Sequence, residues 1–226
     1  MRAVLTRERG RNAATRSWLP EGWTVEEVPV TTTRYEEPAR VAAAAAPGGP
    51  YRWVVVTSAR AARYASVATG ARVAAVGPAS ARALEALGLA CATVGDAGAL
   101  ALVGAIDEGP VLVLGARAGR RELTESLTAR ALTWTLVECY ETVPLALGPE
   151  ERHRLAVADV VVVGAPSAWA VVAGSVEPDA WVVVPGETTR AAVAADHPRV
   201  VVAWGAGATE TLARLVPRRE APGGAQ

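Results

Sequence analysis

An internal repeat constrains the fold of this 226-residue chain more than any other feature of its sequence. Four segments of the first half recur in the same order in the second half, displaced by 107 to 111 residues. Because consistent offsets in one order are unlikely by chance, we interpret the chain as a duplication. The paired segments are 23–27 with 134–138, 54–60 with 161–167, 76–82 with 184–190, and 94–98 with 204–208.

Short β-branched runs alternate with Ala-, Leu- and Arg-rich stretches of helical period, which is typical of parallel βα units. The pattern predicts an α/β protein. We expect helices at 42–46, 80–87, 120–131, 167–173 and 188–195. We expect strands at 3–6, 24–29, 53–56, 72–76, 90–94, 111–114, 135–140, 159–163, 180–184 and 200–203.

The repeat and two linker-like segments predict two Rossmann- or flavodoxin-like domains, each with a parallel five-stranded sheet. The segments 31–34 and 142–145 form a two-stranded linker between them, with the working cleft beside the crossings. A strand that ends in a tyrosine before a proline linker suggests that the middle of the chain folds as one domain. The expected boundaries are 1–32 with 144–218 for domain 1, 35–140 for domain 2, and 219–226 for a disordered tail.

Charge and hydropathy exclude several classes of partner. The 23 basic and 23 acidic residues cancel, so the basic excess of a nucleic-acid-binding protein is missing. No apolar run approaches the roughly 20 residues that span a membrane. The first residues lead directly into a strand pattern and do not resemble a secretory signal. We therefore expect a cytoplasmic monomer that binds neither nucleic acid nor membrane.

The residues that hold metals or form common nucleophilic triads are scarce. Cys91 and Cys139 lie in separate apolar runs without metal-type spacing, so we interpret them as buried, reduced thiols. Neither His153 nor His197 has a suitably spaced carboxylate or cysteine. Segment 115–121 lacks the Gly-Lys-Ser/Thr ending of a phosphate-binding loop. The sequence therefore predicts no metal and no nucleotide.

Small polar residues follow most of the predicted strands, where ligands bind in open parallel sheets. Such turns leave backbone N–H groups able to hold anions, although Ser and Thr are also the preferred helix caps. Arginines near these turns could fork carboxylates. The number of such turns favours a binding site for a polyanion. The candidate binding residues are Arg7, Thr57, Ser58, Ser80, Arg117, Ser167, Thr188 and Thr189.

Tyr140 ends a predicted buried strand just before a linker. It could anchor the edge of a sheet through its amphipathic ring, or it could be a phenolic proton donor at the site. The sequence alone leaves both roles open.

The order of these segments resembles the uroporphyrinogen-III synthase family over residues 5 to about 216. The family's functionally important tyrosine falls on Tyr140, and its threonine near the cleft falls on Thr188. Segments 164–167 and 185–187, both in the second copy, depart from the family pattern. The segments that carry the resemblance are 5–7, 55–61, 76–84, 114–123 and 140–144.

The resemblance implies a lyase that closes linear hydroxymethylbilane to uroporphyrinogen III without a cofactor. Water is lost and ring D is inverted through a spiro intermediate, with Tyr140 assisting the departure of the hydroxyl. The substrate carries acetate and propionate arms, which suits a site of Arg, hydroxyls and helix N-termini. The alternative is a two-lobed small-molecule binding or sensor protein, since such proteins also pair parallel α/β domains. A glycosyltransferase is disfavoured because no nucleotide-sugar motif is visible.

Overall fold

A computed structural model describes residues 1–95, 102–117, 119 and 121–215 of the chain, which divides into two α/β units. Unit 1 combines Met1–Thr32 with Val143–Gln226, and unit 2 is Thr33–Thr142. The expected disordered tail at 219–226 lies outside the described residues. Within the described residues, none of the helices has both the length and the apolar character to cross a membrane.

The sheet of unit 1 has the predicted five strands, all parallel, in the order β11-β10-β9-β1-β2. Because β1 pairs with both β2 and β9, it lies inside the sheet, and each of its residues from Ala3 to Leu5 is fully buried. The strands are β1 (Arg2–Leu5), β2 (Thr24–Glu27), β9 (Val160–Val162), β10 (Trp181–Val184) and β11 (Val200–Val202).

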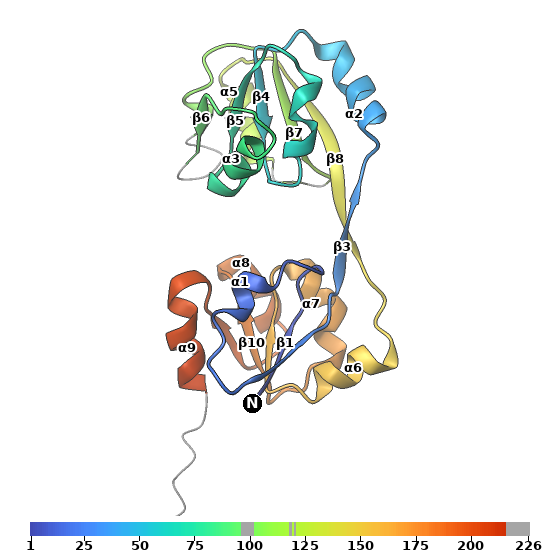
Figure 1. The fold of residues 1–226 in the computed structure, drawn as a ribbon, viewed down its shortest axis with the longest axis vertical. Coiled ribbons are helices and arrows are strands. Elements are labelled where there is room, and N and C mark those ends of the chain that lie inside the picture. The colour runs from blue at the N-terminus through green and yellow to red at the C-terminus, as the bar shows by residue number, and fades with distance from the viewer. Residues whose placement is uncertain (96–101, 118, 120, 216–226) are drawn as a thin grey trace, which may run out of the picture. The chain divides into compact units, whose positions relative to one another are not determined.

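Helices cover both faces of this sheet (Figure 1). Successive residues of β1 alternate between two cores: Val4 belongs to one apolar cluster, and Ala3 and Leu5 to the other. The cluster of Val4 includes side chains of α6 (Pro149–Ala156), α7 (Pro166–Val172), η3 (Ala173–Ser175) and α8 (Glu187–Ala194). The cluster of Leu5 includes α9 (Ala208–Leu215) and Trp18, which follows α1 (Ala13–Arg16), while η4 (Gly205–Gly207) precedes α9.

The sheet of unit 2 has the order β3-β8-β7-β4-β5-β6. Five of these strands are the predicted parallel set, and the sixth is linker strand β3, which adds to the edge at β8. The N–H of Glu36, just after β3, donates to the carbonyl of Cys139 in β8 at 2.9 Å. The strands are β3 (Thr31–Tyr35), β4 (Trp53–Val56), β5 (Arg72–Ala75), β6 (Thr93–Val94), β7 (Val111–Ala116) and β8 (Trp134–Pro144).

Unit 2 also has a core on each face of its sheet. Val54 and Val56 of β4 face a cluster that includes residues of α2 (Pro38–Ala45), η2 (Ala62–Val67) and α3 (Pro78–Glu85). Trp53 and Val55 face the opposite cluster, which includes Leu123 and Leu127 of α5 (Glu122–Ala129). A short helix, η1 (Ala46–Gly48), follows α2.

The two strand orders agree with the duplication. When the strands of each sheet are listed from one edge to the other, β11-β10-β9-β1-β2 of unit 1 corresponds strand by strand to β6-β5-β4-β7-β8 of unit 2. The repeated segments fall on corresponding elements, for example 54–60 on β4 and its following loop, and 161–167 on β9 and its following loop.

Several helices begin one or two residues before their predicted starts. Proline occupies the first turn of α3 and α7, where its missing N–H costs nothing and its fixed φ suits a helix. The residues before these helices, Gly77 and Ala165, have no side chain that could cap them. The prediction had placed the helix starts near Ser80 and Ser167, which instead lie inside the first turns.

Candidate functional site

In each unit the strand order reverses between two central strands, β4 and β7 in unit 2 and β9 and β1 in unit 1. Ligands of open parallel sheets bind at such a point, beyond the carboxyl ends of the strands. Thr57 and Ser58 follow β4 directly, and Arg117 follows β7 directly. Three of the predicted residues of unit 2 therefore lie at its switch point.

Tyr140 joins this group through a hydrogen bond. Its phenolic oxygen lies 2.7 Å from the hydroxyl oxygen of Ser58, and either group can donate. The tyrosine is 7% exposed and belongs to the same apolar cluster as Val56. In addition, the N–H of Arg117 donates to the carbonyl of Tyr140 at 2.7 Å. The structure thus brings together Ser58, Arg117 and Tyr140, which are far apart in the sequence.

An irregularity in β8 aims Tyr140 at Ser58. Gly115 pairs with Glu138 and the next residue, Ala116, pairs with Tyr140, so that Cys139 is an extra residue in β8. Side chains alternate between the faces of a regular strand, whereas a bulge turns the following residue. Here Cys139 and Tyr140 are both buried in one cluster. The bulge therefore places the tyrosine on the face that carries Ser58.

Thr57 is held tightly at the switch point. Its N–H and its hydroxyl both donate to the carbonyl of Leu114 in β7, at 3.1 and 3.0 Å. A Cβ on Gly115 would lie 3.0 Å from this hydroxyl, a tight contact that Thr57 would have to shift by a few tenths of an ångström to relieve. In unit 1, Thr6 makes an equivalent pair of hydrogen bonds in the opposite direction across the switch point, from β1 to β9. Its N–H and its hydroxyl both donate to the carbonyl of Val162, at 3.2 and 2.8 Å.

Gly164, where the sequence departs from the family pattern, lies beside the side chain of Arg7. Gly164 is the second residue after β9 and corresponds in the repeat to Thr57, and a Cβ there would make an ordinary van der Waals contact with the side chain of Arg7 at 3.6 Å. The bridging hydroxyl at this switch point comes instead from Thr6 on the neighbouring strand. The side chains of Arg7 and Trp204 are the nearest neighbours of Gly164.

Aromatic and arginine side chains that no sequence motif marks surround Tyr140. The ring of Tyr35 lies 6.2 Å from that of Tyr140. The guanidinium carbon of Arg60 lies 5.8 Å from the Tyr140 ring, and that of Arg63 lies 4.7 Å from the Tyr35 ring. The spacing of Arg60 and Arg63 after the Thr-Ser pair was the available signal, since residues three apart share a helical face.

Tyr64 completes this surrounding group. It is 2% exposed and its hydroxyl donates to the carbonyl of Glu36 at 2.6 Å. Burial raises the pKa of the Tyr64 phenol above its ordinary value, which is already well above neutral pH, so the hydroxyl is a protonated donor. The bond fixes the end of β3 against η2, next to Tyr35.

Arg117 is already engaged by carboxylates. Its guanidinium lies 3.5 Å from Glu36, 3.3 Å from Glu138 and 3.6 Å from Glu141. Glu141 also pairs with Arg34. Three carboxylates around one guanidinium oppose the approach of a further anion, so the surroundings of Arg117 favour a structural role over carboxylate binding.

The remaining hydroxyl residues lie in the first turns of helices after the strands. Ser80 in α3 and Thr189 in α8 are 4% and 5% exposed, and each is the third residue of its helix, whereas the sequence repeat aligns Ser80 with Thr188. Thr188 of α8 and Ser167 of α7 are exposed. The starts of α3, α7 and α8 receive no side-chain cap, which leaves their positive ends available to anions.

Arg7 lies at the switch point of unit 1 and is held from several sides. Its guanidinium donates to the hydroxyl of Thr15 at 3.4 Å and lies 5.6 Å from the ring of Trp204. Trp18 packs edge-on against Trp204, with ring centroids 5.0 Å apart. The side chain of Asn12 donates to the carbonyl of Arg7 at 3.3 Å. These contacts orient a cation at the carboxyl edge of the sheet.

Neither cysteine has the environment of a reactive thiolate. Burial raises the pKa of Cys139 to about 12, and burial also raises the pKa of Cys91, with Glu85 adding to the effect. Both thiols are free. In the part of the chain that the structure describes, no three His, Cys, Asp or Glu side chains are arranged to hold a metal ion.

Fold and site together define a duplicated, two-unit parallel α/β protein with hydroxyl, aromatic and arginine groups at the switch points of its sheets. The sequence matches the family model described as uroporphyrinogen-III synthase HemD over residues 19–211. The chain therefore belongs to the uroporphyrinogen-III synthase family, whose place is in tetrapyrrole biosynthesis. The comparison with curated protein sequences returned no match.

Solved structures of the same family share the fold. A uroporphyrinogen-III synthetase from Helicobacter pylori matches with a TM-score of 0.66 at 15% identity, covering 95% of this chain and 99% of that one. A mutant uroporphyrinogen III synthase from the extremely thermophilic bacterium Thermus thermophilus matches with a TM-score of 0.59 at 18% identity, covering 95% and 96% of the two chains. At these identities the similarity supports the fold, while the family assignment rests on the sequence match.

Proposed function

We propose that this chain closes hydroxymethylbilane to uroporphyrinogen III with loss of one water, as a lyase that uses no cofactor. The single observation that carries this proposal, beyond membership of the family, is the hydrogen bond between Ser58 and Tyr140 at the switch point of unit 2. It supplies a neutral proton donor at the edge of a sheet where a ligand is expected.

In the proposed acid step, Tyr140 donates its phenolic proton to the hydroxyl of the substrate, which leaves as water. Ser58 donates to the phenolic oxygen in turn and stabilises the charge that develops there. The proton returns to the tyrosine when the ring-closing carbon loses its own, so the protein is unchanged over one turnover.

The binding groups of the proposal are cations, hydroxyls and helix starts that suit a substrate rich in carboxylates. Arg7 is oriented at the edge of unit 1, and Arg60 and Arg63 lie against the tyrosines of unit 2. Arg residues recognise carboxylates through paired hydrogen bonds. The hydroxyl and helix-start contributions would come from Thr57, Ser80, Ser167, Thr188 and Thr189.

Arg117 has a different place in this proposal. Its three glutamate neighbours suggest that it fixes the turn after β7 and, through its N–H, the backbone of Tyr140. We therefore assign carboxylate binding to Arg60 and Arg63 in preference to Arg117. We further infer that the protein works as a monomer in the cytoplasm, where free thiols such as Cys91 and Cys139 stay reduced.

Substitution of single arginines tests whether they bind the carboxylates of the substrate. Replacing Arg63, which is exposed, with Gln should raise the KM for hydroxymethylbilane about tenfold with little change in kcat, because a charge-assisted hydrogen bond contributes about 1.5–3 kcal/mol. Arg40, which is also exposed and lies 4.0 Å from Glu36, is a matched control in the same unit, and Arg40→Gln should leave KM unchanged. Equal effects of the two exchanges would contradict the assignment.

A further inference from the structure

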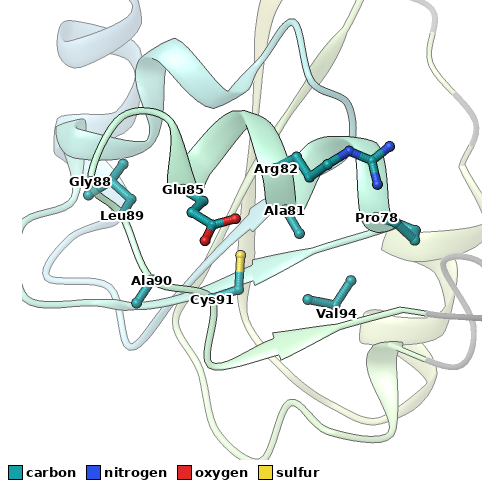
Figure 2. Close-up of a pocket in the computed structure, with 9 residues that line it drawn as sticks. All are labelled: Pro78, Ala81, Arg82, Glu85, Gly88, Leu89, Ala90, Cys91 and Val94. Carbon is teal, nitrogen blue, oxygen red and sulfur yellow. The ribbon is translucent and has the colours of Figure 1, made fainter.

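A pocket lies at the edge of unit 2, away from the Ser58–Tyr140 pair. It is bounded by α3 and by the segment that leads into edge strand β6, and its volume is about 650 Å³ (Figure 2). Ala81, Leu89 and Val94 are apolar residues of its lining. Sites for small molecules in proteins typically measure about 300–1,000 Å³ and combine apolar walls with a few polar groups. The size of the pocket therefore suits a small molecule.

The polar groups of the pocket are two opposite charges on one helix. Arg82 and Glu85 are three residues apart on α3, a spacing at which such residues commonly pair. Figure 2 shows them pointing in different directions, Arg82 toward Pro78 and Glu85 toward Cys91. Arg82 forms no ion pair with any residue that the structure describes. The pocket thus offers a cation at one end and an anion at the other.

Arg190 of unit 1 illustrates the ordinary alternative. It lies on α8, which follows β10 as α3 follows β5, and its Nε donates to both carboxylate oxygens of Glu187 at 2.8 Å. An arginine in such a pair is neutralised within its own helix. Arg82 has a glutamate at the same distance along the helix, yet the two side chains lie apart at the rim of the pocket.

We propose that this pocket binds an amphoteric small molecule with an apolar body. The ligand places a carboxylate against Arg82 and an ammonium or N–H group against Glu85, and its body lies over Ala81, Leu89 and Val94. Arg donates two parallel hydrogen bonds to a carboxylate, which gives the Arg82 end the larger share of recognition. The proposal does not depend on the enzymatic activity proposed above.

Cys91 provides the readout of the experiment because it lines the pocket. Burial and Glu85 raise the pKa of its thiol, so alkylation with iodoacetamide is followed at about pH 9 by peptide mass spectrometry. Cys139 is fully buried with a pKa of about 12 and serves as the internal unreactive control.

Three probes of matched shape separate the two charges: 4-(aminomethyl)benzoate carries both, 4-methylbenzoate only the carboxylate, and 4-methylbenzylamine only the amine. A ligand of this size is expected to bind with a dissociation constant on the order of 1 mM. At roughly 10 mM, 4-(aminomethyl)benzoate should slow the alkylation of Cys91 about tenfold. 4-Methylbenzoate should protect less, and 4-methylbenzylamine least.

Substitutions of Arg82 and Glu85 then show which side chain recognises which charged group of the probe. Arg82→Gln should abolish protection by both carboxylates, while Arg190→Gln, the matched control, should leave it intact. Glu85→Gln should reduce 4-(aminomethyl)benzoate to the level of 4-methylbenzoate. Saturation-transfer NMR with the same probes and variants gives a second measurement that does not depend on the reactivity of Cys91. Equal binding of the three probes, binding that survives Arg82→Gln, or no binding by either method would each overturn the proposal.

Discussion

The bond between Ser58 and Tyr140 makes a quantitative prediction about the stability of unit 2. The two oxygens are 2.7 Å apart and Tyr140 is 7% exposed, so either single exchange leaves a shielded hydroxyl without this partner. A hydrogen bond of this kind contributes about 1 kcal/mol to the free energy of unfolding. Tyr140→Phe and Ser58→Ala should each lower the stability of unit 2 by about that amount. The double substitution should lower the free energy of unfolding little more than one single substitution does, because the first substitution has already broken the hydrogen bond.

Native-state hydrogen exchange on peptides of β4 and β8 is the assay, since it reports the opening of unit 2 even where the two units unfold separately. The coupling energy from the double-mutant cycle should be about 1 kcal/mol. Losses that simply add, within about 0.3 kcal/mol, would refute the bond as a determinant of stability.

The same exchanges separate stability from catalysis. Tyr140→Phe should lower kcat by about 10²-fold if the phenol is the general acid, and Ser58→Ala by about fivefold, since it removes about 1 kcal/mol of orientation. Tyr64→Phe is the matched control, because it also loses a buried hydroxyl bond, at 2.6 Å to Glu36, within unit 2. It should lose stability and keep its kcat. A Tyr140→Phe variant with full activity would remove this residue from the mechanism.

Two further predictions concern other parts of the molecule. Trp204→Leu should raise the KM for hydroxymethylbilane several-fold, because Arg7 loses the ring that orients it. Trp181→Leu breaks the comparable contact of Arg199 and should leave KM unchanged. Steady-state kinetics of both variants tests this prediction. The hydrogen bond from Arg72 lowers the pKa of Asp107 from 3.8 to about 2, so its stabilisation is complete above about pH 4 and is lost as pH falls toward 2. In thermal melts, Asp107→Asn should therefore have a lower Tm than the unsubstituted protein at pH 6 and the same Tm near pH 2. A difference in Tm that does not change with pH would contradict this.

The strands were predictable because their signal is local. Each of the ten expected strands is present, since short β-branched runs between helical segments leave few alternatives. Helix starts were less predictable. The helical pattern predicts starts at Ser80 and Ser167, but the helices begin earlier, at Pro78 and Pro166.

The details of the site depend on contacts between distant residues, which no local pattern reveals. Arg117 is predicted to bind substrate carboxylates, and that stays a prediction; its ion pair with Glu36, which is 81 residues away in the chain, could not be read from the sequence. The orientation of Tyr140 depends on the bulge at Cys139, and regular alternation would have placed its ring on the opposite face. Likewise, Trp204 approaches Arg7 only after the sheet of unit 1 has formed.

The isomer of the product tests the central claim most directly. Purified protein is mixed with hydroxymethylbilane, and the products are oxidised to porphyrins and separated by chromatography. The account predicts that uroporphyrinogen III predominates and that its yield rises with the amount of protein. Exclusive formation of the type I isomer, as in the unaided closure, by protein with an intact fold would contradict it.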